Sequence, residues 1–318
     1  MTQKPGLLAL ALLCAVAAPA LAFELQGHRG ARGLEPENTL PAFERAIALG
    51  VDVLELDTGV TSDGIVVVSH ERRLSPDLAR GPDGQWVEAP GPLLRDITLL
   101  RLRRFDLGRI RPDSRAAKRF PEQRSYDGIS MPSLNEVLAL GLQPGRRALR
   151  FNIETKLAPD APDETLRPEA FAQALIDTLQ QSGIAPARVT VQSFDWRTLA
   201  VVNSIAPEIA TVCLTAERDW LNNVQKGRAG PSPWTAGLDI DEHGGSVPRL
   251  VTAAGCSVWS PYHRDLTPET LAEAHGLGLK VVVWTVNDPA DLRTLRDMGV
   301  DGIITDYPDR ANEALGRE

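Results

Sequence analysis

Short runs of apolar and β-branched residues recur along the chain, and most are followed by a segment with helical capping residues. Ser, Thr or Asn precedes the three clearest helical segments, and glycine stands at or just after their ends: 40–48, 134–140 and 268–276. This alternation of strand and helix predicts an α/β protein with a parallel sheet and helical crossovers.

Nine runs have the length and composition of strands: 24–27, 53–58, 65–69, 149–155, 189–193, 210–214, 257–260, 280–286 and 302–305. Only a turn at Thr61-Ser62-Asp63-Gly64 separates the second run from the third. Successive parallel strands need a crossover of roughly a dozen residues or more. We therefore expect a local hairpin there, so the nine runs fit the eight strand places of a barrel.

Two polar stretches are longer than ordinary connections between strands and helices. Residues 72–131 are rich in Arg, Asp, Pro and Gly and contain no clear strand run. We interpret them as an insertion over the mouth of a barrel rather than as an independent domain. Residues 218–245 contain Trp220, Trp234 and several glycines, and they are predicted to form another long loop on the same rim.

Residues 1–22 have the pattern of a secretory signal peptide. Lys4 is their one charged side chain, residues 7–16 are apolar, and small residues occupy the two positions that a signal peptidase recognises. The apolar run is shorter than the about 20 residues that a bilayer span requires. We expect cleavage near Ala22 and export to the periplasm or the medium, which leaves residues 23–318 as one barrel domain.

A lipoprotein anchored at Cys14 is the weaker alternative, because the bulky Leu13 stands where a small residue is needed. Two cysteines follow the predicted cleavage site, Cys213 and Cys256, and an oxidising compartment would allow them to pair. Each lies in an apolar, strand-like setting, so we favour two separately buried thiols.

The formal net charge is −8, and removal of Lys4 makes the exported chain one unit more negative. So acidic a chain is a poor partner for nucleic acid. No run after the signal approaches the length of a membrane span, so we expect no stable membrane insertion. The 43% hydrophobic content suffices for the core of one large barrel or two medium domains, and it leaves the oligomeric state open.

The strongest local motif is His28-Arg29-Gly30, directly after the first strand run. Alone, the pair could be a solvated strand end. Glu55 and Asp57 favour a functional site over a solvated strand end, because residues two apart in a strand point to the same side. Two carboxylates on one face of a buried strand repel each other, and a bound cation is the simplest way to keep both ionised. A solvated edge strand is the alternative.

A third carboxylate, Glu154, stands at the end of a later strand and shares a face with Asn152 and Lys156. Acidic oxygens without Cys or additional His favour one hard divalent cation, Ca²⁺ with Mg²⁺ as the alternative, over zinc. Beside such a site, Lys156 and Arg29 become candidate ligands for two non-bridging phosphate oxygens.

The third strand run ends in His70, and the expected hairpin returns this histidine toward Glu55 and Asp57. Two histidines near one metal suit general acid and general base roles, because imidazole titrates near neutral pH without perturbation.

Taken together, these motifs resemble the glycerophosphodiester phosphodiesterase family over residues 24–312. The matching motifs occur in family order: His28-Arg29-Gly30, Pro36-Glu37-Asn38-Thr39, Glu55-Leu56-Asp57, Asp63-Gly64, Val67-Val68-Ser69-His70, Met131-Pro132-Ser133-Leu134 and Trp284-Thr285-Val286-Asn287. The resemblance implies a distorted (β/α)8 TIM barrel. It also implies metal-dependent hydrolysis of small glycerophosphodiesters, such as glycerophosphocholine and glycerophosphoethanolamine, to glycerol 3-phosphate and an alcohol.

The resemblance implies that His28 and His70 are the acid–base pair. It implies that Glu55, Asp57 and Glu154 bind the cation, and that Arg29 and Lys156 contact the phosphate. One departure is visible, because the family commonly has Asp after the second histidine and this chain has Glu71. The longer side chain puts the local loop geometry in doubt.

Residues at later strand ends are candidates for the substrate cleft. Gln192 and Phe194 end the fifth run, and Trp284 resembles a tryptophan that lines the mouth of the barrel in the family. An aromatic residue at such a position is often part of the core. We nevertheless predict that Gln192 and Trp284 contact the substrate, Trp284 on its glycerol or alcohol side.

Three alternatives remain for the function. Phospholipase D-like toxins share the barrel and the acidic triad, but the polar 72–131 insertion differs from the apolar rim expected for lipid substrates. Phosphatidylinositol-specific phospholipases C also pair two histidines on a barrel, yet many lack the triad. A binding protein that has lost turnover is disfavoured because all seven chemical positions are present. Attack by the glycerol 2-hydroxyl and direct attack by water are equally compatible with the sequence, and His28 is the preferred acid.

Overall fold

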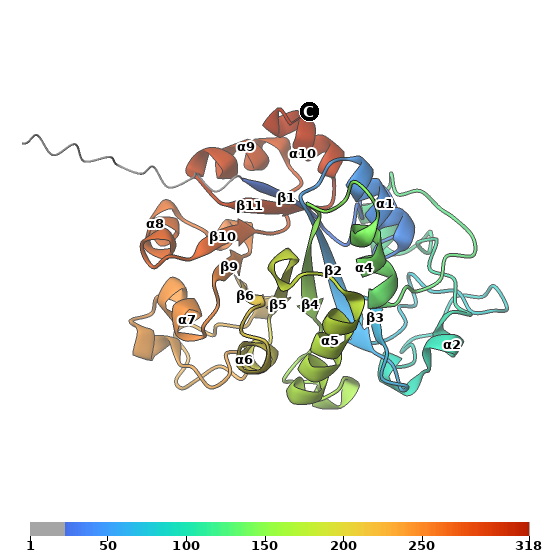
Figure 1. Ribbon diagram of the computed structural model, residues 1–318, viewed down its shortest axis with the longest axis horizontal. Coiled ribbons are helices and arrows are strands. Elements are labelled where there is room, and N and C mark those ends of the chain that lie inside the picture. Colours follow the sequence, from blue (N-terminus) through green and yellow to red (C-terminus); the bar gives the residue numbers. More distant parts are fainter. Residues whose placement is uncertain (1–22, 318) are drawn as a thin grey trace, which may run out of the picture.

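The computed structural model describes residues 23–317, so the predicted signal peptide lies outside the described residues (Figure 1). Eight parallel strands form a closed sheet in the order β1-β11-β10-β9-β6-β5-β4-β2, and pairing of Gln26 with Val53 and of Gly27 with Leu54 closes it. The strands are β1 (Glu24–Gly27), β2 (Val53–Val60), β4 (Arg150–Thr155), β5 (Val189–Ser193), β6 (Ala210–Thr215), β9 (Val258–Pro261), β10 (Lys280–Val283) and β11 (Gly302–Thr305). The predicted distorted TIM barrel is confirmed.

Helices lie around the outside of the sheet, as Figure 1 shows. They are α1 (Leu40–Ala48), α4 (Leu134–Leu142), α5 (Pro168–Ser182), α6 (Trp196–Ile205), α7 (Val247–Ala253), α8 (Pro268–Gly276), α9 (Pro289–Met298) and α10 (Pro308–Leu315). The capping residues seen in the sequence start them: the Thr39 hydroxyl accepts from the amide of Ala42, and Ser133 forms a reciprocal capping box with Glu136.

Strand β3 (Val66–Val68) is the local hairpin partner that the short turn predicts. It pairs antiparallel with the end of β2, with Thr58 opposite Val68. This strand adds an edge beside the barrel and leaves the eight parallel places to the other runs. The hairpin also turns the residues after β3 back toward the carboxyl end of β2.

The two faces of β2 show why this sequence folds with carboxylates inside. Leu54 and Leu56 belong to the main hydrophobic core between sheet and helices. Alternation then turns Glu55 and Asp57 to the other face, into the barrel. In the register of β2 with β4, Glu55 is opposite Asn152 and Asp57 is opposite Glu154. The parallel pairing therefore brings all three predicted metal ligands to one end of two neighbouring strands.

The interior of the barrel is polar on one side and apolar on the other. The Asn152 amide donates to Gln26 Oε1 at 3.0 Å and to Gln192 Oε1 at 2.8 Å, across β1, β4 and β5. On β6, β9, β10 and β11 the inward side chains form a separate apolar cluster: Val212, Val258, Val282 and Ile304. The buried polar side chains of the first side are hydrogen-bonded to one another, and the apolar side chains of the other side need no hydrogen bonds.

The 72–131 insertion contains short helices and no strand of the barrel: η1 (Leu94–Asp96), α2 (Leu99–Leu102) and α3 (Arg115–Arg119). Its apolar side chains, Met131 among them, form a small cluster with Val67 of β3. Arg72 and Arg73 both bind Glu164 after β4, and the amide of Gln123 donates to the carbonyl of Arg32 after β1. These contacts hold the insertion along one side of the rim. Its status as part of a single domain stays a prediction.

Two further expectations can be compared with the structure. Cys213 of β6 and Cys256, just before β9, form a disulfide with a Cα–Cα distance of 5.9 Å, so the expectation of two separate thiols is wrong. Because β6 and β9 are neighbours in the sheet although far apart in sequence, the two residues meet. In the described part of the chain, none of the helices combines the length and apolar character that a bilayer span requires.

Candidate active site

The three predicted metal ligands converge at the carboxyl ends of β2 and β4. Glu55, Asp57 and Glu154 are buried, and each offers a carboxylate oxygen that lies within 4.8 Å of the others. Catalytic residues of TIM barrels come from these strand ends. Three carboxylates without a sulfur or imidazole ligand in the group suit a hard divalent cation.

Electrostatics in this cluster also fit a cation. Burial and the neighbouring charges of Asp57 and Glu154 raise the pKa of Glu55 well above its usual value. Burial raises the pKa of Glu154 to about 7, against the charge of Lys156. Burial would raise the pKa of Asp57 too, but Lys156 and Arg29 outweigh it and hold that pKa well below its usual range.

One oxygen of the cluster is left without a hydrogen bond. Asp57 Oδ1 is buried and unbonded, although Lys156 Nζ lies 3.1 Å away. A buried carboxylate oxygen normally has a partner. The residues present therefore fit a divalent cation, for which Asp57 Oδ1 would be a ligand in place of its ion pair with Lys156.

Arg29 and Lys156 lie against the acidic cluster. Lys156 Nζ is 2.7 Å from Glu154 Oε1, and the Arg29 guanidinium is 3.1 Å from Asp57 Oδ2 and 2.7 Å from Glu37 Oε1. The backbone amide of Arg29 donates to Glu55 Oε2 at 2.8 Å. The chain turns after β1 to make this bond, and Arg29 has a φ of 51° in that turn. Both cations face the cavity, and in this structure both are paired with carboxylates.

His28 follows β1 and is held by a buried carboxylate from β11. Its Nδ1 lies 2.6 Å from Asp306 Oδ1, while its Nε2 is 3.9 Å from Glu55 Oε2. Burial and the charge of Arg32 lower the pKa of His28 to about 3, against the opposing effect of Asp306. The imidazole is therefore neutral, with Nδ1–H donating to Asp306 and the Nε2 lone pair on the side of the acidic cluster.

His70 is arranged in the same way from the other side. Its Nδ1 lies 2.8 Å from Glu71 Oε1, so the longer side chain that departs from the family pattern still reaches the imidazole. Burial and the charges of Arg29 and Lys156 lower the pKa of His70 to about 4. Each histidine thus has a carboxylate on Nδ1, which leaves Nε2 for proton transfer.

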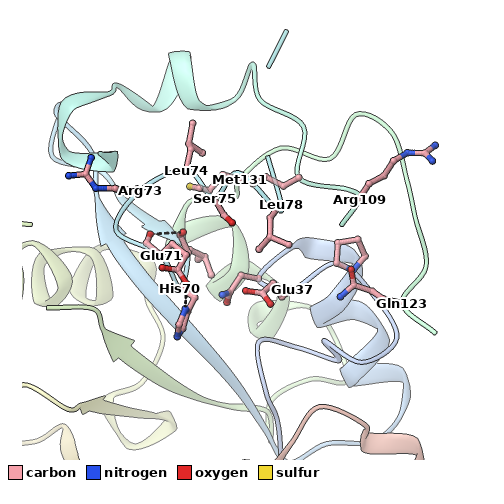
Figure 2. A pocket seen from close by; sticks show the side chains of 15 residues that line it. Glu37, His70, Glu71, Arg73, Leu74, Ser75, Leu78, Arg109, Gln123 and Met131 are labelled. Atoms are coloured by element: carbon pink, nitrogen blue, oxygen red, sulfur yellow. Dashed lines mark hydrogen bonds and ion pairs between the residues drawn. The ribbon is translucent and has the colours of Figure 1, made fainter. Parts of the chain in front are cut away.

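Figure 2 shows His70 and Glu37 together at the foot of a small pocket of about 40 Å³ beneath the insertion. Leu74, Leu78 and Met131 form its opposite wall, and Arg73 and Arg109 point away from it. The pocket is room for a water molecule or two. The insertion thereby forms one wall of a small cavity beside His70.

Gln192 and Trp284 occupy different parts of the site. The Gln192 amide donates to Glu55 Oε1 at 2.8 Å, so it positions a carboxylate of the acidic cluster. Trp284 follows β10, with its ring centroid 5.2 Å from that of Phe194 and 5.5 Å from that of Tyr262. The indole N–H donates to the carbonyl of Ser260, which fixes the ring.

A cavity of about 670 Å³ at the carboxyl end of the barrel joins these groups. Eight of the nine predicted site residues line it: His28, Arg29, Glu55, His70, Glu154, Lys156, Gln192 and Trp284. The ninth, Asp57, lies against Arg29 and Lys156 and is not part of the lining. The volume suits a small organic ligand.

Several functional groups were missed in the sequence. Asp306 directly follows the last strand run, so its position at a strand end was a usable signal. Asn38 was interpreted as part of a helix cap, whereas its amide donates to Asp57 Oδ2 at 2.9 Å and the cap is Thr39. Arg32 gave no separate signal, because its partner Asp306 follows the distant strand β11. Glu37 was seen only as part of a motif, and its side chain binds Arg29.

The fold and the site together define the class of protein: an enzyme that hydrolyses phosphoric diesters on a TIM barrel. A buried acidic triad, two histidines held by carboxylates and two cations lie together at the strand ends, and all of them except Asp57 line one cavity.

Comparison with known proteins gives the family. Residues 28–310 match the glycerophosphoryl diester phosphodiesterase family. A putative glycerophosphoryl diester phosphodiesterase from Silicibacter pomeroyi DSS-3, known from a crystal structure, is 34% identical with a TM-score of 0.82, over 94% of each chain. A glycerophosphodiester phosphodiesterase of Bacillus subtilis (strain 168) is 29% identical over 89% of this chain and 83% of its own. The chain belongs to this family and is a glycerophosphodiester phosphodiesterase.

The same fold occurs in more distant relatives. An Oleispira antarctica phosphodiesterase, solved in complex with the product sn-glycerol-3-phosphate, is 23% identical with a TM-score of 0.65, over 92% of this chain and 96% of that one. At this identity the likeness concerns the fold.

Proposed function

We propose that this enzyme uses a divalent cation and two histidines to hydrolyse small glycerophosphodiesters, including glycerophosphocholine and glycerophosphoethanolamine, to glycerol 3-phosphate and an alcohol. The observation that carries the proposal is the convergence of Glu55, Asp57 and Glu154 within 4.8 Å, beside the cavity that Glu55, Glu154, His28 and His70 line. Bound there, a cation would supply electrostatic stabilisation of the charge that builds on the phosphate oxygens.

Other residues of the chain bind the phosphate and transfer protons. Arg29 and Lys156 exchange their carboxylate partners for non-bridging oxygens of the substrate and orient the phosphate. One imidazole accepts, through Nε2, the proton of the attacking group, which is water or the glycerol 2-hydroxyl; a cyclic phosphate formed by the hydroxyl is opened by water in a second step. The other imidazole, after protonation, donates to the departing alkoxide, and the carboxylate on its Nδ1 stabilises the imidazolium.

Ca²⁺ is the preferred ion, with Mg²⁺ as the alternative. Three carboxylates from two strands form an irregular set of ligands, which Ca²⁺ tolerates better than the strictly octahedral Mg²⁺. Titration of the metal-free protein with each ion, followed by thermal melting, would rank them. A larger rise in melting temperature with Mg²⁺ at equal concentration would reverse the preference.

We also propose export to the periplasm or the medium, with cleavage near Ala22. The disulfide between Cys213 and Cys256 supports this, because structural disulfides belong to oxidising compartments. Fractionation of producing cells, with amino-terminal sequencing of the isolated protein, tests it.

Incubation of purified protein with glycerophosphocholine and glycerophosphoethanolamine, with and without chelator, tests the function through release of glycerol 3-phosphate. Hydrolysis should stop on chelation and return with added cation. Activity that persists after complete removal of metal contradicts the role of the acidic cluster. His28→Ala and His70→Ala should each lose activity while folded, and His275→Ala, at a surface ion pair, is the matched control.

A further inference from the structure

The cavity has two chemically different walls on opposite sides of the barrel. In the closed strand order, β2 and β4, which carry the acidic cluster, face β9 and β10 across the mouth. Tyr262 directly follows β9 and Trp284 directly follows β10. A diester whose phosphate lies at the acidic cluster therefore has room to extend one of its two arms toward the far wall.

The far wall is built of aromatic rings, and we call it the aromatic wall. Its members come from the ends of three strands, from the hairpin of β7 (Glu217–Arg218) and β8 (Leu221–Asn222), and from the loop that follows: Phe194, Tyr262, Trp284, Trp220 and Trp234. Trp284 meets Phe194 at an interplanar angle of 80° and Trp220 at 79°. In each of these edge-to-face contacts only one face of one ring is used, and every ring of the wall has two faces.

Around this wall the described lining residues carry no ionised carboxylate and few hydrogen-bonding groups. Leu214, Leu221 and Ile304 complete it, with Thr285 as its one hydroxyl besides Tyr262. The apolar cluster inside the barrel lies directly below, with Trp284 packed against it. A ligand group bound here finds π faces and apolar surface but hardly any hydrogen-bond acceptors.

A cation already packs on one of these rings. The guanidinium of Arg218 lies 5.1 Å from the centroid of the Tyr262 ring, and Asp265 binds it at 2.6 Å. The ion pair compensates the charge of Arg218, which would otherwise repel a second cation. One ring of the aromatic wall thus already makes a cation–π contact.

We propose that the aromatic wall binds the quaternary ammonium group of a choline-type alcohol, so that the enzyme prefers glycerophosphocholine to glycerophosphoethanolamine. The inference rests on the proposed function and adds the alcohol specificity. A trimethylammonium group needs no hydrogen bonds and gains from ring faces. A primary ammonium has three donors that this wall leaves unsatisfied, and the hydroxyls of a glycerol or inositol arm meet the same cost.

Trp220 is the ring best suited to test the proposal. It lies at the tip of the β7–β8 hairpin with 61% of its surface exposed, and its centroid is 5.6 Å from that of Tyr262. Because it packs on other rings of the wall and not in the core, its replacement leaves the barrel intact. Trp220→Phe keeps a π face, whereas Trp220→Leu keeps apolar bulk without one.

The first experiment compares kcat/KM for glycerophosphocholine and glycerophosphoethanolamine. We expect a preference of about tenfold for the choline substrate, the size of a cation–π contact of moderate strength. Trp220→Leu should reduce this ratio severalfold and Trp220→Phe much less. Leu100→Ala, an exposed residue of α2 outside the cavity, is the control and should keep the ratio. Equal values for both substrates in the unmodified protein overturn the proposal.

The second experiment separates charge from size. Choline and its uncharged isostere 3,3-dimethylbutan-1-ol are titrated against the protein, with tryptophan fluorescence and inhibition of hydrolysis as readouts. Choline should bind about tenfold more tightly. Equal binding of the two compounds would show that the aromatic wall is merely apolar, and it would refute the proposed ammonium site. If neither diester is hydrolysed but choline still quenches tryptophan fluorescence, the proposed function fails and the binding site stands.

Discussion

His28 Nδ1 lies 2.6 Å from Asp306 Oδ1, a contact between residues 278 positions apart that neighbouring strands β1 and β11 bring together. Asp306 is held in turn, because Asn287 donates to its Oδ2 at 2.7 Å and Arg32 donates to both oxygens. A carboxylate fixed in this way determines which imidazole nitrogen carries the proton and stabilises the imidazolium when it forms.

Asp306→Asn should lower kcat by on the order of a hundredfold or more, within the range of acid–base contributions. The amide keeps the shape of the side chain but removes the charge that raises the pKa of His28. The limb of the pH–rate profile that reports His28 should therefore move to lower pH. Initial rates across the pH range, with a thermal melt to confirm folding, provide the measurement.

A surface pair supplies the control for this substitution. Asp301 binds His275 Nε2 at 2.9 Å, away from the cavity, so Asp301→Asn changes the same type of contact without touching the site. Its rate and profile should match those of the unmodified protein. A variant at position 306 that folds and keeps both its rate and its pH profile would remove Asp306 from the mechanism.

The sequence predicted those parts of the site whose signals are local. Glu55 and Asp57 share a face because they are two residues apart, and the short turn after β2 required the hairpin that carries His70. Their convergence with Glu154 depends on the pairing of β2 with β4, which the strand and helix alternation made predictable.

Contacts set by strand order were not predictable in the same way. Arg32 and Asp306 meet because the barrel closes by pairing β1 with β11, and neither sequence position indicates the other as its partner. The disulfide was missed for the same reason, since each cysteine alone has the surroundings of a buried thiol. The aromatic wall draws on three strand ends, the β7–β8 hairpin and the loop after it; the sequence placed Phe194, Trp220, Trp234 and Trp284 near the rim, but it did not show that their rings meet.

Gln192→Ala should weaken cation binding by about ten- to a hundredfold, the usual effect of removing a residue that orients a metal ligand. The Gln192 amide donates to Glu55 Oε1, and without it the carboxylate loses its fixed orientation. Calorimetric titration of the metal-free protein with Ca²⁺ gives the affinity. Gln173→Ala, an exposed glutamine of α5, is the matched control. Unchanged affinity in the Gln192 variant would show that Glu55 is oriented by its other contacts alone.

Loss of the disulfide should lower the free energy of unfolding by about 4 kcal/mol, the chain-entropy value for a closed loop of this length. The bridge spans 43 residues of sequence and lies outside the cavity lining, so kcat/KM of the folded protein should not change. Urea unfolding of Cys213→Ala/Cys256→Ala measures the effect. A reducing agent should destabilise the unmodified protein and leave the double variant unaffected; the same response in both would mean that the bridge does not form.

Cation affinity should rise with pH between about 6 and 8, because the ion must displace protons from carboxylates whose pKa is raised. Burial raises the pKa of Glu154 to about 7, and that of Glu55 lies well above its usual value. A folded-state pKa above the unfolded one means that Glu154 favours folding at low pH. In the metal-free protein this contribution is lost as the pH rises through about 7.

A bound cation offsets this loss of stability, because it binds the ionised carboxylate of Glu154 and compensates its negative charge. For one displaced proton, the dissociation constant should fall about tenfold from pH 6 to pH 8. Calorimetry in two buffers of different ionisation enthalpy counts the protons released, and the melting temperature should gain more from the cation at pH 8 than at pH 6. An affinity that is constant over this range, with no proton release, would mean that all three carboxylates are already ionised, held so by Arg29 and Lys156.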